Sequence, residues 1–269
     1  MTDRYAVIGH PVAHSRSPEI HTLFAQQTGE DIVYERLLAP LPAFRETVAA
    51  FRAAGGKGLN VTLPFKPEAC RYADVRSPAA AAADAVNTLR FDEGVVFGDN
   101  TDGIGLVRDI EINLATAIAG RRVLLIGAGG AARGVLGLLA EAKPQCIVIV
   151  NRTHERAVLL ARQGGLTTPV EASRYEQLDG TRFDLVINAS AASLEGAAPP
   201  IPDGVFSTDA LAYDMVYGKG ITPFMAQAAA AGARAADGLG MLVEQAAESF
   251  FIWRGKRPDA AAVLARLRG

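Results

Sequence analysis

Apolar and polar positions along the chain follow the periods of strands and helices in turn. In the first hundred residues, the predicted strands are residues 5–9, 32–38, 59–63, 88–91 and 95–97. Apolar residues three and four positions apart predict helices over residues 18–27 and 41–54. Ser17 is placed to cap the first of these helices, and Gly29 lies just beyond its end. The last two strands flank Asp92-Glu93-Gly94, a sequence typical of a hairpin turn.

Longer strand–helix units follow from about residue 104. The predicted order is a helix at 104–118, a strand at 123–126, a helix to 142, a strand at 146–150, a helix from 154, and strands at 185–188 and 212–216. Such repetition is typical of a parallel sheet with crossover helices. A last helix has one apolar face, formed by Leu239, Leu242, Val243, Ala246, Phe250 and Trp253. The fold class is therefore α/β, with two domains.

Composition narrows the kind of protein. Lys and Arg number 27 against 29 Asp and Glu, so the net charge of −2 favours neither a nucleic-acid nor a membrane partner. No uncharged apolar stretch reaches the ~18 residues of a membrane span, and the N-terminal apolar run is too short for a signal peptide. We therefore expect a soluble, cytoplasmic protein. Cys70 and Cys146 have no pairing or ligand spacing, and the histidines show no metal-binding pattern, so no metal site is expected.

A glycine-rich turn follows the strand at 123–126. Gly127, Gly129 and Ala132 form the pattern G-x-G-x-x-A between a buried strand and a helix. Glycines allow the tight turn and a close backbone approach to a pyrophosphate, which the amides at the helix start then bind. The alternative is a packing turn without a ligand, but the strand–turn–helix context favours a dinucleotide site.

The residues after the next strand indicate which dinucleotide. NAD sites usually place an acid here, but this chain has Asn151-Arg152-Thr153, with Arg156 four residues beyond Arg152. Two guanidinium groups at i and i+4 would lie on one helix face and could clamp a 2′-phosphate. The pattern favours NADP over NAD. The alternative is two arginines on a solvated helix start.

Several polar residues form a second candidate site. In the strand at 59–63, Leu63 would face the core with its apolar neighbours, while Asn60 and Thr62 face the other way. Pro64 ends this strand, so Lys66 would lie beside them at the edge where open α/β sheets bind ligands. The alternative is a solvated edge strand.

Other polar clusters have simpler interpretations. Ser15 and Ser17 share one side if extended, although Ser17 before Pro18 is more typical of a helix cap. In the turn at residues 98–103, Thr101 or Asp102 could cap the following helix, and Asn87 could be a turn residue.

Taken together, these motifs resemble the shikimate dehydrogenases, NADP-dependent enzymes of aromatic amino-acid biosynthesis. The resemblance spans essentially the whole chain. It rests on GHPVAHSRSPEIH from Gly9, NVTLPFK from Asn60, AVNT from Ala85, DNTDG from Asp99, GAGGAAR from Gly127, NRT from Asn151, DMVY from Asp214, TPF from Thr222 and DGLGMLVEQAA from Asp237.

The resemblance implies a function and a domain plan. The reaction would be the reversible NADPH-dependent reduction of 3-dehydroshikimate to shikimate in the shikimate pathway, by a monomer or homodimer. Residues 1–103 would form the substrate-binding catalytic domain and 104–237 a Rossmann-like NADP-binding domain. Residues 238–269 would form helices that pack on the substrate domain.

The resemblance also assigns roles to individual residues. Lys66 and Asp102 would be the catalytic acid–base pair. The substrate-binding residues would be Ser15 and Ser17 at the carboxylate, with Asn60, Thr62, Asn87, Tyr217 and Gln245. The cofactor-binding residues would be Gly127, Ala128, Gly129, Gly130, Ala131, Asn151, Arg152, Thr153, Arg156, Met215 and Gly238.

The chain departs from the family pattern after Asn188-Ala189. Ser190-Ala191-Ala192-Ser193 replaces the usual threonine, serine or proline, and glycine, in the loop expected near the nicotinamide. Two other functions remain open: a quinate/shikimate dehydrogenase of relaxed cofactor choice, and a non-catalytic NADP-binding sensor. The Lys66/Asp102 pair argues against the sensor, because a sensor needs no proton donor.

Overall fold

The computed structural model describes residues 2–218 and 220–269, and the chain folds into two compact units. The first unit comprises Met1–Gly105 together with Val243–Gly269, and the second comprises Leu106–Leu242. Two helices, α5 (Asp102–Arg108) and α9 (Leu239–Arg254), contain the boundaries between the units.

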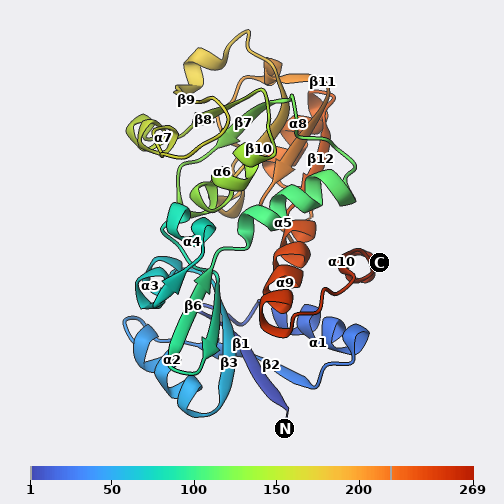
Figure 1. The fold of residues 1–269 in the computed structure, drawn as a ribbon. Helices are drawn as coiled ribbons and strands as arrows, with labels where there is room; N and C mark the ends of the chain where they lie inside the picture. Colours follow the sequence, from blue (N-terminus) through green and yellow to red (C-terminus); the bar gives the residue numbers. More distant parts are fainter. Residues whose placement is uncertain (1, 219) are drawn as a thin grey trace. The chain divides into compact units, whose positions relative to one another are not determined.

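The first unit is built around a six-stranded sheet (Figure 1). Its strands are β1 (Asp3–Gly9), β2 (Ile32–Leu38), β3 (Gly56–Val61), β4 (Val75–Arg76), β5 (Thr88–Asp92) and β6 (Val95–Asp99). Its helices are α1 (Ser17–Thr28), α2 (Phe44–Ala53), α3 (Lys66–Tyr72), α4 (Pro78–Ala83) and α10 (Ala260–Arg268). The strand order is β2-β1-β3-β5-β6-β4.

This sheet is mixed. Strand β1 pairs in parallel with β2 and β3, whereas β3 pairs antiparallel with β5, and β5 with β6. The predicted hairpin is therefore confirmed. Strand β3 ends at Val61, two residues earlier than predicted, and Leu63 is 68% exposed rather than in the core. Once the chain leaves the sheet, the period of two no longer fixes which way a side chain points.

Side chains from alternate positions of β1 pack into two separate cores. Ala6 and Ile8 face the apolar side of α2, where Phe44 and Val48 are fully buried. Tyr5 and Val7 face the other way, with Tyr34 of β2 and Trp253 of α9. The sheet is thus covered on both faces, which explains why β1 is buried along most of its length.

The second unit contains a six-stranded sheet that is parallel throughout its described ladders. Its strands are β7 (Arg122–Ile126), β8 (Cys146–Val150), β9 (Val170–Ser173), β10 (Phe183–Asn188), β11 (Phe206–Asp214) and β12 (Arg234–Asp237). Its helices are α6 (Gly130–Glu141), α7 (His154–Ala161) and α8 (Pro223–Ala230), with short turns η1 (Asp109–Asn113), η2 (Tyr175–Leu178), η3 (Ala192–Glu195) and η4 (Asp203–Val205).

The strand order β9-β8-β7-β10-β11-β12 is that of a doubly wound dinucleotide-binding sheet. Helix α6 packs on one face through Val135 and Leu139, and α8 packs on the other through Phe224 and Ala228. Because both faces are covered, the central strands are nearly continuous apolar runs, and the predicted parallel sheet is confirmed. Its topological switch point lies between β7 and β10.

The predicted helix over residues 104–118 is wrong in its second half. Helix α5 ends at Arg108, and a π-helical turn, η1, follows to Asn113. In this turn the fully buried Asp109 accepts hydrogen bonds from the Tyr213 hydroxyl (2.5 Å) and from the Asn113 amide (3.0 Å). A widened turn commonly marks a place where side-chain contacts override regular helix geometry.

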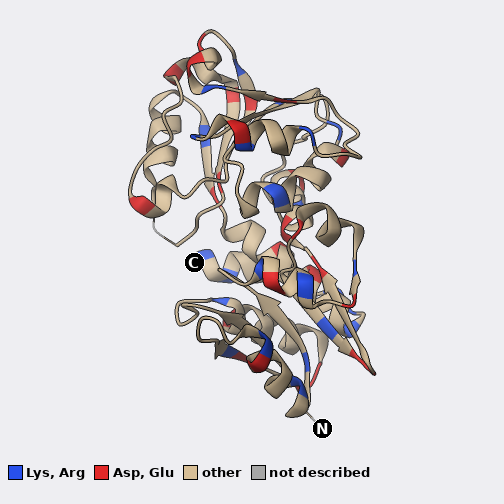
Figure 2. Cartoon of the chain, turned by 90° about the vertical axis from the view of Figure 1, so that its left-hand side faces the viewer, with Lys and Arg blue, Asp and Glu red and all other residues tan. Residues whose placement is uncertain are grey.

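Charged residues of both signs are interspersed over both units in the view of Figure 2. This distribution matches the net charge of −2. Among the residues that the structure describes, no helix is both long enough and apolar enough to cross a membrane.

Candidate active site and cofactor-binding loop

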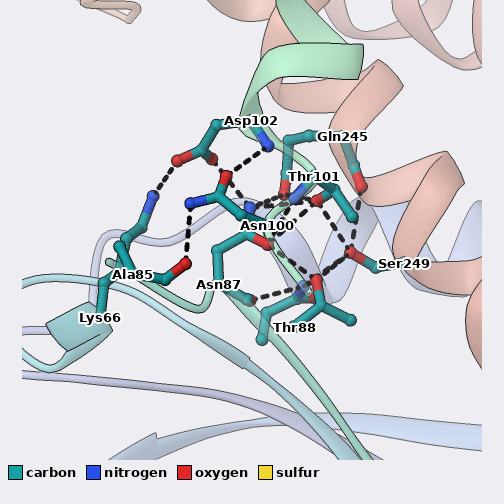
Figure 3. A network of polar contacts seen from close by, with 10 residues as sticks. Lys66, Ala85, Asn87, Thr88, Asn100, Thr101, Asp102, Gln245 and Ser249 are labelled. Carbon is teal, nitrogen blue, oxygen red and sulfur yellow. Dashed lines mark hydrogen bonds and ion pairs between the residues drawn. The ribbon is translucent and has the colours of Figure 1, made fainter. Parts of the chain in front are cut away.

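Lys66 and Asp102 form an ion pair in the first unit. Lys66 is the first residue of α3, and Asp102 begins α5. The Lys66 Nζ atom lies 2.5 Å from Asp102 Oδ2, and the two side chains are 25% and 10% exposed (Figure 3). A partly exposed ammonium held by a carboxylate can still reach a small molecule with its remaining N–H bonds.

Asn87 fixes the other oxygen of this carboxylate. Its amide nitrogen donates to Asp102 Oδ1 (2.8 Å) and to the Thr101 hydroxyl (3.0 Å), while its amide oxygen accepts from the Thr101 backbone (2.9 Å). Asn100 accepts from the Asp102 backbone N–H (3.1 Å) and so caps α5. The prediction that Asp102 could cap this helix is wrong, because Asp102 is already its first residue.

Asn60 lies in the same polar network. Its amide nitrogen donates to the Asn87 carbonyl (3.2 Å), the Thr88 hydroxyl (3.2 Å) and the Ser249 hydroxyl (2.9 Å). Gln245, one turn before Ser249 on α9, accepts from Asn87 (3.4 Å) through its side-chain oxygen. Figure 3 shows Asn87, Gln245 and Ser249 converging on one region, although Gln245 and Ser249 come from α9.

Ser15 and Ser17 come together in front of α1. The Ser15 hydroxyl lies 3.1 Å from the Ser17 hydroxyl and accepts from the Ser17 backbone N–H (3.2 Å). The prediction that Ser17 caps α1 is wrong, because Ser17 is the first residue of the helix and its N-cap, Arg16, makes no side-chain cap. Gly29 lies just beyond the end of the helix, as predicted, and adopts the left-handed conformation there.

Thr62 lies just after β3, and its backbone N–H continues the ladder to Ile8 of β1 (2.9 Å). Its methyl group packs so closely on Gly9 that a side chain at position 9 would collide with it. The methyl group of Thr62 is therefore held against the last residue of β1. Tyr217, also predicted to bind substrate, belongs to the second unit and is half-buried there.

The glycine-rich loop joins β7 to α6 in the second unit. Gly127 has φ +111°, a conformation that side chains disfavour, and a Cβ here would press on the backbone of Ala189 and Ser190. Gly129 and Gly130 face open space, and the N-terminus of α6 has no side-chain cap. An open glycine surface before uncapped helix amides is the arrangement that binds a dinucleotide pyrophosphate, so these residues fit such a group.

Asn151, after β8, supports this loop. Its side-chain oxygen accepts from the Ala128 backbone N–H (3.2 Å), and its amide nitrogen donates to the Thr153 carbonyl (2.9 Å). Arg152 and Arg156 are exposed. The prediction that they share a helix face is wrong, because α7 begins at His154 and Arg152 precedes it. Ala131, predicted at the cofactor, is exposed in the first turn of α6.

A buried carboxylate organises the neighbouring loop. Asp214 is fully buried and accepts from the hydroxyls of Ser193 and Thr222 (2.6 Å each), the Asn188 amide (3.3 Å) and the Val216 backbone (3.1 Å). The segment Ser190-Ala191-Ala192-Ser193 is thus attached to the end of β11 through its last serine.

The same loop adjoins Met215 and Gly238. The Met215 backbone donates to the Asn188 carbonyl (3.0 Å), and Gly238 donates to the Val216 carbonyl (3.1 Å). A side chain at position 238 would collide with the Met215 carbonyl. The two predicted cofactor residues are therefore neighbours. Met215 directly follows Asp214, and Gly238 directly precedes α9.

Sequence reasoning did not place Ser249 or Asp214 in these networks, and it considered Thr101 only as a helix cap. Ser249 falls between apolar positions of α9, and nothing local distinguishes it from a solvated serine. Asp214 offered a signal, because a carboxylate at the end of a buried apolar strand requires donors. Within the described residues, no group of three or more His, Cys, Asp or Glu side chains could hold a metal ion.

Three family profiles match the chain. Residues 7–89 match the shikimate dehydrogenase substrate binding domain, residues 111–195 match shikimate / quinate 5-dehydrogenase, and residues 238–268 match the shikimate 5′-dehydrogenase C-terminal domain. Among curated relatives, shikimate dehydrogenase (NADP(+)) of Nitrosospira multiformis is 57% identical over 269 residues, covering 100% of this chain and 98% of that protein.

Solved structures agree with these matches. Shikimate 5-dehydrogenase of Thermus thermophilus, in complex with NADP(H) and shikimate, superposes with a TM-score of 0.89 at 35% identity, covering 99% of each chain. An Ael1 enzyme from Pseudomonas putida gives a TM-score of 0.94 at 48% identity, covering 99% of this chain and 98% of that chain.

Proposed function

Because this chain belongs to the shikimate dehydrogenase family, we propose that it catalyses the reversible NADPH-dependent reduction of 3-dehydroshikimate to shikimate, with Lys66 and Asp102 as its acid–base pair. The observation that carries the residue assignment is the contact of 2.5 Å between the Lys66 ammonium and the Asp102 carboxylate. The activity is that of an NADP-dependent oxidoreductase.

The proton step follows from this contact. Bound NADPH supplies the hydride, and the reduced carbonyl oxygen then requires a proton. Lys66 donates this proton during reduction and accepts it during oxidation, because both directions pass through the same transition state. Asp102 holds the ammonium, and Asn87 fixes the carboxylate through its second oxygen (2.8 Å).

The remaining polar residues of the first unit provide the substrate contacts. Ser15 and Ser17 offer two adjacent hydroxyls for the substrate carboxylate. The ring hydroxyls would bind to Thr62 and to the polar network of Asn60, Asn87, Asp102 and Gln245. A site built from hydrogen-bonding groups rejects a substrate that lacks a hydroxyl, since its own buried groups would then be unpaired. Tyr217 of the second unit is a further substrate contact in this proposal.

The second unit supplies the cofactor contacts. The open glycine surface of Gly129 and Gly130 and the first amides of α6 would hold the diphosphate. Arg152 and Arg156 would hold the 2′-phosphate. The other contacts in this proposal are Gly127, Ala128, Ala131, Asn151, Thr153, Met215 and Gly238.

The substitution Lys66→Ala tests the proton step. General acid–base assistance contributes about 10²- to 10⁴-fold, so we expect kcat for shikimate oxidation to fall by that factor. The Kd for NADPH is expected to stay within about twofold, because Lys66 takes no part in cofactor binding. Lys57→Ala, an exposed lysine on β3, is the matched control and should keep full activity. An unchanged kcat in Lys66→Ala would remove this residue from the mechanism.

The arginines are tested by cofactor selectivity. In Arg152→Ala and Arg156→Ala, we expect kcat/KM for NADP⁺ to fall by about tenfold or more, because each variant loses a charge-assisted contact to the 2′-phosphate. The kcat/KM for NAD⁺ should change little. Arg162→Ala, at the other end of α7, is the control. Equal losses of kcat/KM with NADP⁺ and NAD⁺ would contradict the role of the arginines at the 2′-phosphate. Separately, the same assays with quinate in place of shikimate measure substrate choice.

A further inference from the structure

The edge strand β2 presents two side chains, Tyr34 and Arg36, that the proposed mechanism does not use. Two residues apart on a strand, they leave its same face. Both make contacts with residues assigned above to the substrate: Tyr34 with Asn60, and Arg36 with Ser15. Strand β2 itself contributes no residue to the proposed site.

Tyr34 is anchored as a rigid donor. It is buried, and its ring stacks on the ring of His21 with centroids 4.2 Å apart and planes within 5°. Its hydroxyl donates to Asn60 Oδ1 over 2.7 Å. Burial raises the pKa of Tyr34 well above its ordinary value, and interaction with the Ser17 side chain partly opposes that rise. The phenol is therefore a neutral donor beside both Asn60 and Ser17.

The Tyr34 hydrogen bond determines what Asn60 can offer to a substrate. The amide nitrogen of Asn60 already donates within the network, to Ser249 among others (2.9 Å). Its oxygen accepts from Tyr34 and retains one lone pair. Asn60 is thus oriented as an acceptor for a substrate hydroxyl. Without the phenol, the buried oxygen loses its donor and the amide loses one of the contacts that fix its rotation.

Arg36 contacts Ser15, which is proposed to bind the substrate carboxylate. Its Nε and Nη2 atoms both donate to the Ser15 carbonyl, at 3.0 and 2.6 Å. A planar guanidinium that makes two bonds to one oxygen fixes the position of that peptide group. The Ser15 hydroxyl, on the same residue, is the one that meets the Ser17 hydroxyl at 3.1 Å.

We propose that Tyr34 and Arg36 are positioning residues for the substrate, with Tyr34 orienting Asn60 and Arg36 fixing the backbone of Ser15. The proposal rests on the assignment of Ser15, Ser17 and Asn60 to substrate binding. Holding these groups in place before the substrate arrives reduces the ordering cost of binding. The effect therefore falls on the affinity for shikimate and not on the proton step at Lys66.

Tyr34→Phe tests the first residue, because it removes the hydroxyl and keeps the stacked ring. We expect the KM for shikimate to rise about three- to tenfold, the scale of one hydrogen bond, with kcat and the KM for NADP⁺ within about twofold. The matched control is Tyr5→Phe. Tyr5 pairs with Tyr34 in the sheet, is also buried and stacks on Trp253, but its hydroxyl accepts a hydrogen bond from Arg254 (3.3 Å).

Arg36→Met tests the second residue. Arg36 is exposed, so this variant is expected to fold even if Tyr34→Phe does not. The KM for shikimate should again rise about three- to tenfold, and the KM for NADP⁺ should not change. The control Arg4→Met removes an exposed guanidinium of the neighbouring strand that pairs with Glu35 (2.8 Å). Thermal unfolding of every variant measures any general loosening of the unit.

Ser15→Ala and Ser17→Ala, assayed in parallel, separate this inference from the proposed site. If the serine variants raise the KM for shikimate while Tyr34→Phe and Arg36→Met leave it unchanged, the site stands and the positioning role is overturned. An equal rise of the KM in the Tyr5→Phe and Arg4→Met controls would also overturn the positioning role. If the serine variants leave the KM unchanged, the proposed carboxylate site itself fails.

Discussion

At the scale of single residues, burial decides the chemistry of His21. This residue of α1 is fully buried between aromatic rings, stacked on Tyr34 and edge-on to Phe24 (5.8 Å). Burial lowers the pKa of His21 to about 3, because its apolar surroundings do not solvate the charged ring. Interaction with the Asn60 side chain only partly opposes this lowering of the pKa. The histidine serves as a neutral packing group.

The stability of the first unit should therefore depend on pH. Unfolded histidine binds a proton below about pH 6.5, but folded His21 does so only near pH 3, so stability falls as the pH falls through this window. The free energy of unfolding should decrease by up to about 1.4 kcal/mol per pH unit from this group. Chemical denaturation at several pH values between 7 and 4.5 gives the free energy of unfolding as a function of pH. Its slope against pH should be shallower for His21→Phe than for wild type. His14→Phe, at an exposed position, should not alter the slope.

At the scale of elements, the ends of β10 and β11 depend on one carboxylate. Asp214, at the end of β11, accepts from Ser193 in the loop after β10 and from Thr222 before α8. The Thr222 hydroxyl is also the N-cap of α8, because it accepts from the Met225 backbone N–H (3.2 Å). The hydrogen bond from Ser193 thus fixes the loop after β10 to the end of β11.

Ser193→Ala measures this attachment. The substitution removes a donor from a fully buried carboxylate, which costs about 1–3 kcal/mol. We expect that loss of unfolding free energy for the second unit, together with a raised KM for NADP⁺, because the loop adjoins Gly127. Thr208→Ala, at an exposed position of β11, should change neither value. A stable Ser193→Ala variant would show that the remaining donors to Asp214 suffice.

Other elements show where local pattern fails. The apolar runs of β7 and β8 predicted these strands closely, because strands buried on both faces contain little else. Strands β9 and β12 were not predicted, since neither contains a fully buried residue. They are strands because they add to the edges of a sheet that is already formed.

At the scale of the whole molecule, each unit has its own core, and the first unit takes part of its core from the C-terminus. Phe250 of α9 is fully buried in the first unit, edge-on to Phe24 (5.9 Å). Arg254 forms ion pairs with Asp3 of β1 (2.5 Å) and with Glu30. The first unit therefore requires chain segments from both ends of the sequence.

Two core substitutions test the independence of the units. Phe250→Ala should lower the free energy of unfolding of the first unit by about 3–5 kcal/mol. Hydrogen exchange should show the lost protection in β1 and β3 but not in β7 and β10. Phe183→Ala, a fully buried phenylalanine of β10, should give the reverse pattern. Equal loss of protection in both units for either variant would contradict separate cooperative cores.

The sequence by itself determined the parallel sheet of the second unit, its glycine-rich loop and the absence of an acid after β8, because these features reside in consecutive residues. The roles of separate polar residues came from resemblance to a family, and local spacing alone gave weaker or wrong interpretations, as for Ser17 and Arg152. Only the tertiary structure joined Lys66 to Asp102, 36 residues away, and Asn60 to Ser249, 189 residues away. A hydrogen bond between distant residues leaves no periodic signal in the chain, since folding and not sequence distance decides which side chains meet.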